Sequence, residues 1–308
     1  MKAETLQLHQ KRRISEIITV SAQYLVANAK SLFVGIALLS LPLLGLAKLG
    51  AFLITGNPIA LESVLRYKDI VGKNSFMLLI FCFILFITGI CTYLLSIYKN
   101  VVLNTADAKD KEVTFETIKQ DFGEDLNSFV INFLIIYLIY FVTKLGVDYI
   151  NIWSRSSFAS ESFMVGVIAY YAQDFIIDLP GILVLSVCFY FCISTLFVCY
   201  RDKIGAADAM GKVWSLAQKI PQKTWLNCTL LFIVAYLLHF FFRIIINFTE
   251  FNFFYPYSTP LIRIISDLLK LALDCFIFAF FQIASILLFG SNEEEAEGRS
   301  IKTKIETV

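Results

Sequence analysis

The sequence is poor in charged residues. Asp, Glu, Lys and Arg together make up 17% of the 308 residues, whereas 58% are apolar. Soluble domains carry roughly 25% charged residues, so this chain has too little polar surface to coat a water-soluble core of its size. The composition excludes a soluble globular protein. The net charge of +1 also gives no reason to expect a nucleic-acid partner.

Glycine and proline are scarce, at 14 and 6 residues, which excludes collagen-like and disordered chains. Histidine is rarer still: the two residues are His9 and His239, so a histidine-rich metal site is not expected. The sequence has no HExxH zinc motif, no GxxxxGK phosphate-binding loop and no GxSxG nucleophile motif. We therefore expect neither an enzyme nor a cofactor.

The seven cysteines all lie within apolar runs, which excludes a disulfide framework in the loops. They are Cys82, Cys91, Cys188, Cys192, Cys199, Cys228 and Cys275. Buried free cysteines usually act as small apolar side chains. We expect that role here, including for Cys188 and Cys192, which are one helical turn apart.

Six apolar runs are long enough to cross a bilayer, which requires roughly 20 residues per helix. They are Leu32 to Leu53, Phe76 to Tyr98, Phe129 to Val147, Pro180 to Tyr200, Trp225 to Asn247 and Leu261 to Gly290. A further apolar stretch, residues 163–177, is separated from the fourth run by Asp174, Asp178 and Pro180. We interpret it as an interfacial or re-entrant helix, with a seventh crossing as the alternative. The sequence thus predicts an all-α membrane protein of six transmembrane helices, arranged as three hairpins.

Loop Lys and Arg residues predict the orientation, because positive residues near helix ends stay on the cytoplasmic side. They concentrate before the first run, after the second and fourth runs, and after the sixth run. We therefore expect a multi-pass protein of the cytoplasmic (inner) membrane with both termini in the cytoplasm. The N-terminal stretch lacks the features of a cleaved secretory signal, so the first run is expected to remain as an anchor.

An amphipathic segment precedes the first, third and fifth runs. The apolar faces comprise Ile14, Ile17, Ile18, Ser21, Tyr24 and Leu25 in the first, Phe115, Ile118, Phe122, Leu126 and Phe129 in the second, and Met210, Val213, Trp214, Ala217 and Ile220 in the third. Each segment meets its apolar run at a hydroxyl residue, namely Ser31, Ser128 or Thr224, at nearly equal intervals. We predict three cytoplasmic amphipathic helices, which can lie in the plane of the membrane. We favour helices that pack under the bundle and order the loops, with lipid sensing or docking of a partner as the alternative.

This pattern predicts one transmembrane domain, residues 1–290, with pseudo-repeats at about 14–98, 114–200 and 206–290. A charged cytoplasmic tail, residues 291–308, would follow it. We interpret Glu293, Glu294 and Glu295 in this tail as a solvated charge cluster.

Ionisable side chains inside lipid are costly and tend to face the bundle interior or a water path. His239 and Arg243 share one face of the fifth run, and Asp267 and Asp274 share one face of the sixth. Folding the last hairpin brings these four residues together as a candidate intramembrane polar cluster, with Asp274 as the most deeply buried acid. We favour interhelical contacts that stabilise the bundle over a proton or solute pathway.

The segments KRRISEIITVSAQYLVANAKSLF (Lys11 to Phe33) and ILLFGSNEEEAEGRSIKTKIE (Ile286 to Glu306) resemble the two ends of a family of multi-pass proteins from Bacteroidetes without assigned function. The alternation of amphipathic helix and hairpin is more distantly similar to the membrane domain of bacterial glycerophosphodiester phosphodiesterases. The resemblance implies a six-crossing bacterial inner-membrane protein. The metal-binding soluble barrel of those phosphodiesterases has no counterpart in this sequence, so no catalytic residue carries over.

The function we expect is a non-enzymatic integral membrane protein that organises lipid or a membrane protein complex. Its expected partners are membrane lipids and either another membrane protein or a second copy of the chain. The alternative is a transporter or channel for a small solute or proton, using His239, Arg243, Asp267 and Asp274.

Overall fold

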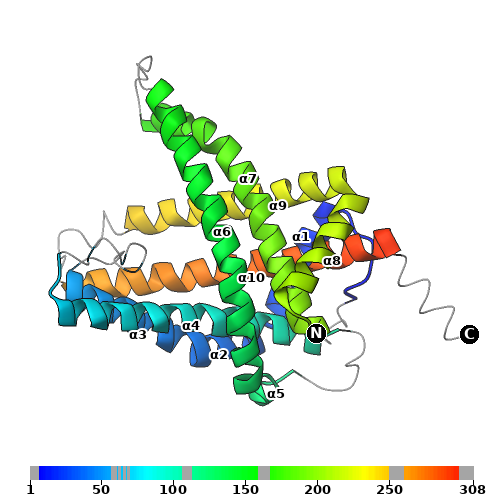
Figure 1. The fold of residues 1–308 in the computed structure, drawn as a ribbon, viewed down its shortest axis with the longest axis horizontal. Coiled ribbons are helices and arrows are strands. Elements are labelled where there is room, and N and C mark those ends of the chain that lie inside the picture. Colours follow the sequence, from blue (N-terminus) through cyan, green and yellow to red (C-terminus); the bar gives the residue numbers. More distant parts are fainter. Residues whose placement is uncertain are drawn as a thin grey trace, which may run out of the picture. The chain divides into compact units, whose positions relative to one another are not determined.

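A computed structural model of the chain describes residues 7–56, 61, 64, 67, 70–105, 113–158, 167–249 and 260–297, and the elements in these ranges are helices (Figure 1). They are α1 (Ile14–Ala27), α2 (Ala29–Gly35), the π-helix η1 (Ile36–Ser40), α3 (Leu41–Thr55), α4 (Lys73–Leu103), α5 (Phe115–Lys119), α6 (Phe122–Phe158), α7 (Val167–Asp202), α8 (Ala206–Lys219), α9 (Pro221–Thr249) and α10 (Pro260–Glu297).

The chain divides into two compact units, each built from separate stretches of sequence. Unit 1 comprises Met1–Leu8, Ile18–Val130 and Ala235–Ile283, and unit 2 comprises His9–Ile17, Ile131–Val234 and Ala284–Val308.

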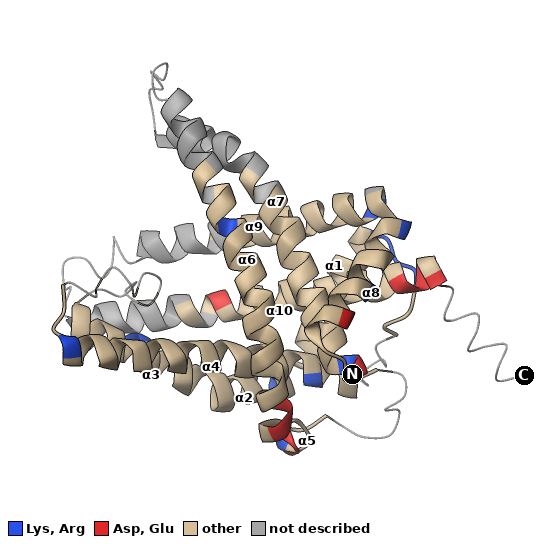
Figure 2. Ribbon diagram, in the orientation of Figure 1, with Lys and Arg blue, Asp and Glu red and all other residues tan. Residues whose placement is uncertain are grey.

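Five described helical segments are long and apolar enough to cross a membrane. They are Ala29–Thr55, Lys73–Leu103, Phe122–Val147, Val184–Asp202 and Leu273–Glu297. Figure 2 shows long uncharged stretches along α4, α6 and α7. The prediction of an all-α, multi-pass membrane protein is therefore confirmed. The fifth predicted run falls on α9, where the apolar part found among the described residues, Lys223–Leu238, is shorter than a full crossing.

The interpretation of residues 163–177 as a separate helix is wrong. From Val167 onward these residues belong to α7, which continues without a break through Pro180 to Asp202. From Val167 the stretch is therefore continuous with α7 and is not a separate helix ended at Pro180, whereas residues 163–166 lie outside the described residues. Proline is tolerated in membrane helices because neighbouring groups satisfy the freed carbonyl.

The first amphipathic segment forms α1 with the predicted face buried, including Ile17, Tyr24 and Leu25. The second segment is not one helix. It consists of α5, which begins at a capping box on Thr114, and the first turns of α6. The two are separated by Asp121, whose φ of 53° lies in the left-handed region that ends a helix.

The third segment forms α8, and most of its predicted apolar face is buried or partly buried. Val213 and Ala217 are buried, and Met210 and Ile220 are partly buried. Trp214 is the exception on that face: it is 56% exposed, and its ring lies 5.6 Å from that of Phe191. Ala206, Ala209 and Leu216 are buried as well, although they were not assigned to the predicted face.

In unit 1, α3 packs closely against α4 through small residues. A Cβ added at Gly89 of α4 would lie 2.8 Å from the Leu44 side chain, and one added at Gly50 of α3 would lie 2.7 Å from the Cys82 sulfur. Ala47 and Ala51 are fully buried in the same core. Small residues allow the close backbone approach that supplies packing energy between membrane helices.

Burial changes along the length of α4. Its first half exposes large apolar side chains such as Met77, Leu78 and Phe81, whereas residues 91–101 are all buried. A 31-residue helix is about 46 Å long at 1.5 Å per residue, which exceeds the roughly 30 Å of a bilayer core. The end of α4 therefore packs against protein, while its first half presents an apolar surface suited to lipid. Residues 279–294 of α10 are buried in the same way.

Candidate functional site

The structure tests the predicted intramembrane cluster only in part. His239 and Arg243 lie in helix α9 and Asp267 lies in helix α10, but their side chains fall outside the described residues. The Asp274 side chain is half-buried and interacts with its surroundings. The pairing of these four residues remains a prediction. The depth of Asp274 in the membrane also remains a prediction, and Glu293 on the same helix is fully buried within the protein.

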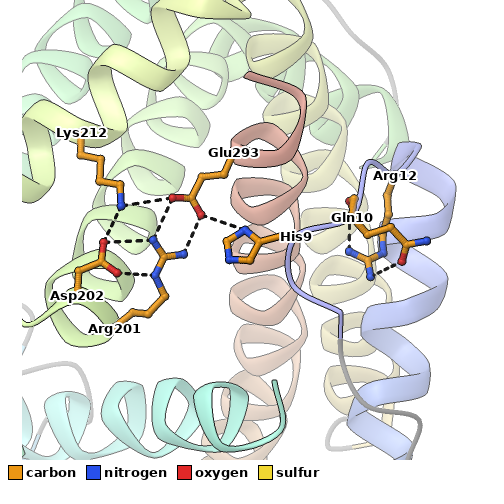
Figure 3. Close-up of polar contacts among 7 residues, drawn as sticks. All are labelled: His9, Gln10, Arg12, Arg201, Asp202, Lys212 and Glu293. Atoms are coloured by element: carbon orange, nitrogen blue, oxygen red, sulfur yellow. Dashed lines mark hydrogen bonds and ion pairs between the residues drawn. The ribbon is translucent and has the colours of Figure 1, made fainter. Parts of the chain in front are cut away.

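A different group of charged residues comes together in unit 2 (Figure 3). We call it the Glu293 cluster, and its members are His9, Arg201, Asp202, Lys212 and Glu293. Glu293 comes from α10, Arg201 and Asp202 from the end of α7, Lys212 from α8, and His9 from the segment before α1. The cluster therefore joins four segments that are distant in the sequence.

Arg201 connects the two acids of the cluster. Its Nη1 and Nη2 atoms donate to the Glu293 carboxylate at 2.7 and 3.0 Å, and its Nε donates to Asp202 Oδ1 at 2.7 Å. Such two-pronged guanidinium–carboxylate contacts are among the strongest hydrogen bonds in proteins. They fix the orientation of both carboxylates.

Lys212 and His9 complete the surroundings of the acids. Lys212 Nζ donates to Asp202 Oδ2 at 2.6 Å and lies 3.5 Å from Glu293 Oε1. His9 Nδ1 lies 3.5 Å from Glu293 Oε2. Without a proton on His9, the charges of Arg201 and Lys212 balance those of Asp202 and Glu293. A neutral, hydrogen-bonded group of this kind can be buried without an uncompensated charge.

The sequence positions these side chains through helical periodicity. Phe197 and Arg201 are four residues apart on α7, and Phe289 and Glu293 are four residues apart on α10, so each pair lies on one helix face. The Arg201 guanidinium lies 5.5 Å from the Phe197 ring centre and 5.6 Å from that of Phe289. The two rings meet edge to face and add cation–π attraction to the ion pairs.

The end of α10 also holds the segment that precedes α1. We call residues 9–13 the N-terminal strap. The Arg12 amide donates to Ser291 Oγ at 2.9 Å, and Lys11 Nζ lies 3.5 Å from Glu295 Oε1. Lys223 at the start of α9 also donates to Glu295. Burial lowers the pKa of the Arg12 guanidinium, which hydrogen-bonds to Gln10 within the strap.

Two similar hydrogen bonds link a residue within the predicted first or third repeat to an asparagine two residues beyond the end of that repeat. In unit 1, Asn100 Nδ2 near the end of α4 donates to Ser31 Oγ at 3.2 Å, across 69 residues. In unit 2, Asn292 Nδ2 near the end of α10 donates to Thr224 Oγ1 at 3.3 Å, across 68 residues. In both cases, an asparagine near the end of α4 or α10 donates to the hydroxyl residue that directly precedes the first or fifth predicted apolar run.

Unit 1 contains its own buried polar contacts near the end of α4. Tyr24 Oη donates to Asn100 Oδ1 at 2.5 Å and accepts from Asn104 Nδ2 at 3.1 Å. Lys99 donates to Asp125 Oδ2 at 2.9 Å and to the Gln120 carbonyl. Burial raises the pKa of the Tyr24 hydroxyl well above its ordinary value. These contacts join α1, α4 and the start of α6.

The charged side chains of the Glu293 cluster neutralise one another. Its acids are engaged by cations of the same chain, and the described residues include no grouping of three or more His, Cys, Asp or Glu side chains able to hold a metal ion. Acidic residues at a helix C-terminus are unfavourable with the helix dipole. The cations of α7, α8 and the strap offset that penalty for α10, so the arrangement fastens segments together.

Sequence reasoning missed this site. We interpreted Glu293 to Glu295 as solvated, whereas Glu293 is 0% and Glu294 is 9% exposed. One available signal was the run of acids where α10 ends, because a helix C-terminus disfavours acids that lack cationic partners. The other was the matched spacing of an aromatic residue and a charge on both α7 and α10.

The chain matches no family model, no curated protein and no solved structure.

Proposed function

We propose that the protein is a non-enzymatic integral protein of the bacterial cytoplasmic (inner) membrane that organises lipid or a membrane protein complex. In this proposal it crosses the bilayer six times as three hairpins, and both termini lie in the cytoplasm. The observation that carries the proposal is the Glu293 cluster, which uses its charges to fasten segments together.

The contact between the strap and α10 supports the topology. His9 and Arg12 precede the first crossing, and their partners Glu293 and Ser291 lie near the end of the last one. Groups in direct contact lie on the same side of a membrane, so these contacts favour an even number of crossings. Five segments qualify as crossings, and α9, with 29 residues, is long enough to supply the sixth.

The pairing within the cluster favours organisation over transport. Ionisable groups that carry a proton or solute face a water-filled path. Glu293 instead has no exposed surface, and Arg201, Lys212 and His9 surround its carboxylate. A carboxylate enclosed by three cationic or basic side chains holds helices in place.

One surface available for lipid or a partner lies on α8 and the start of α9. Trp214 is 56% exposed, Trp225 is 52% exposed and Leu226 is 61% exposed. Tryptophan favours the boundary between the headgroups and the acyl chains. Trp225 directly follows the polar-to-apolar step at Thr224, which is the expected depth for such a residue.

Purification in mild detergent, with quantification of co-purified lipids and proteins, tests the proposal. The wild type should retain a lipid class above its share of the membrane, or a stoichiometric protein, and a W214A/W225A variant should lose it. Leu230→Ala, at a 38% exposed apolar position of α9, serves as the control and should retain it. The proposal fails if the wild type enriches nothing. It also fails if liposomes containing the protein take up a proton or solute in a manner abolished by Asp274→Asn, which is the outcome of the transporter alternative.

A further inference from the structure

The N-terminal strap is held on α10 by contacts of unequal character. The hydrogen bond from the Arg12 backbone N–H to Ser291 Oγ involves no charged group, so its strength does not change between pH 5 and 8. The Lys11 side chain is 66% exposed, so its contact with Glu295 is weak. His9 is different, because its partner Glu293 is fully buried.

Histidine is the side chain whose ordinary pKa places its change of charge between pH 5 and 8. A protonated His9 would present a cation 3.5 Å from the Glu293 carboxylate, whereas a neutral His9 presents only a weak dipole. Its side chain is 33% exposed, so protons from the solvent reach it. The state of His9 therefore determines how strongly the strap is attracted to α10.

Other charged groups near the strap come from every neighbouring element. They are Glu293, Glu294 and Glu295 on α10, Arg201 and Asp202 on α7, Lys212 on α8, Lys223 on α9, Glu16 on α1, and Lys11, Arg12 and Arg13 in the strap itself. Arg201, Asp202, Lys212 and Glu293 together carry no net charge, and the atom of this group that the structure places against His9 is a carboxylate oxygen.

We propose that His9 and Glu293 form a proton-operated clasp, which fastens the N-terminal strap onto the end of α10 when His9 is protonated and loosens it when His9 is neutral. A group that gains an anionic partner on folding contributes stability at low pH, and this contribution is lost as the pH rises. Acidification should therefore tighten the strap, and the Arg12 amide should then exchange more slowly.

Hydrogen–deuterium exchange of the full-length protein in detergent micelles measures this directly. The readout is the exchange rate of the segment 9–13 in the wild type relative to His9→Gln at the same pH, which cancels the chemical pH dependence of exchange. We expect the wild type to exchange about two- to fivefold more slowly than the variant at pH 5.5, as a partly exposed ion pair allows. The two should exchange alike at pH 8.

Two further variants identify the group responsible. His9→Lys carries a charge at both pH values, so its strap should be protected to the same degree at pH 5.5 and pH 8. His239→Gln removes the other histidine of the chain and should behave like the wild type. The proposal is overturned if the ratio of wild type to His9→Gln is the same at both pH values, or if His239→Gln abolishes the response.

The clasp rests on the proposed function only for the placement of this end of α10 in the cytoplasm. The exchange experiment requires neither lipid enrichment nor a partner. An exchange ratio that does not change with pH would therefore refute the clasp and leave the co-purification result unaffected. Failure of the co-purification experiment would likewise leave the exchange result unaffected.

Discussion

Replacement of Arg201 by glutamine should cost about 3 kcal/mol of unfolding free energy. The change removes both hydrogen bonds to Glu293 and the bond to Asp202 Oδ1, and it leaves Glu293 fully buried with Lys212 and His9 each 3.5 Å away. Removing one partner of a buried ion pair typically costs about 3 to 5 kcal/mol. We expect the lower end of that range, because Lys212 still offsets part of the charge on Glu293.

A double variant separates the ion pair from the packing of Arg201. If the cost arises from the unpaired carboxylate, R201Q/E293Q should recover at least half of it, because no buried charge is then left without its partner. If the cost arises from the lost contacts with Phe197 and Phe289, the double variant should be no more stable than R201Q.

The assay is equilibrium unfolding in mixed detergent micelles, followed by helical circular dichroism with increasing denaturing detergent. Lys11→Gln is the matched control. It removes a cation from another contact at the end of α10, but Lys11 is 66% exposed, so its cost should stay within about 0.5 kcal/mol. If R201Q lowered the unfolding free energy by less than about 1 kcal/mol, the Glu293 cluster would not be the main interaction that stabilises the C-terminal end of α10.

Three further predictions concern other parts of the chain. Gly89→Ala should destabilise the protein by about 1 to 3 kcal/mol, because its Cβ would overlap Leu44, whereas Gly45→Ala, with open space around it, should be neutral or slightly stabilising; the same unfolding assay compares them, and equal effects would contradict the packing argument. Tyr24→Phe should cost about 1 to 3 kcal/mol at neutral pH through the lost bonds to Asn100 and Asn104. Burial raises the pKa of Tyr24 above its ordinary 10.0, so the wild type should lose its stability advantage over Tyr24→Phe as the pH rises beyond 10. A difference in unfolding free energy that stays constant above pH 10 would contradict this prediction. Tags on the two termini should both be protected from protease in intact spheroplasts, and exposure of one tag alone would disprove an even number of crossings.

The apolar runs could be predicted well, because lipid acts on each segment separately. A run such as Phe76 to Tyr98 needs no partner to be recognised, since its own side chains decide whether it enters the membrane. The face of α1 was predictable for the same reason, because its burial follows the helical period around Ile17 and Tyr24. The separation of residues 167–177 from the fourth run was misinterpreted, because Pro180 and the nearby acids disfavour a helix only in isolation, whereas α7 continues past them.

The class of helical membrane protein follows from composition, since too little charge and too many apolar runs leave no soluble alternative. The environment of each charge, in contrast, depends on how the helices pack. Glu293 looks solvated beside Glu294 and Glu295, yet its partner Arg201 is 92 residues away and His9 lies near the opposite end of the chain. Electrostatic stabilisation depends on distances in space, and these are set by how α7, α8, α10 and the strap pack together.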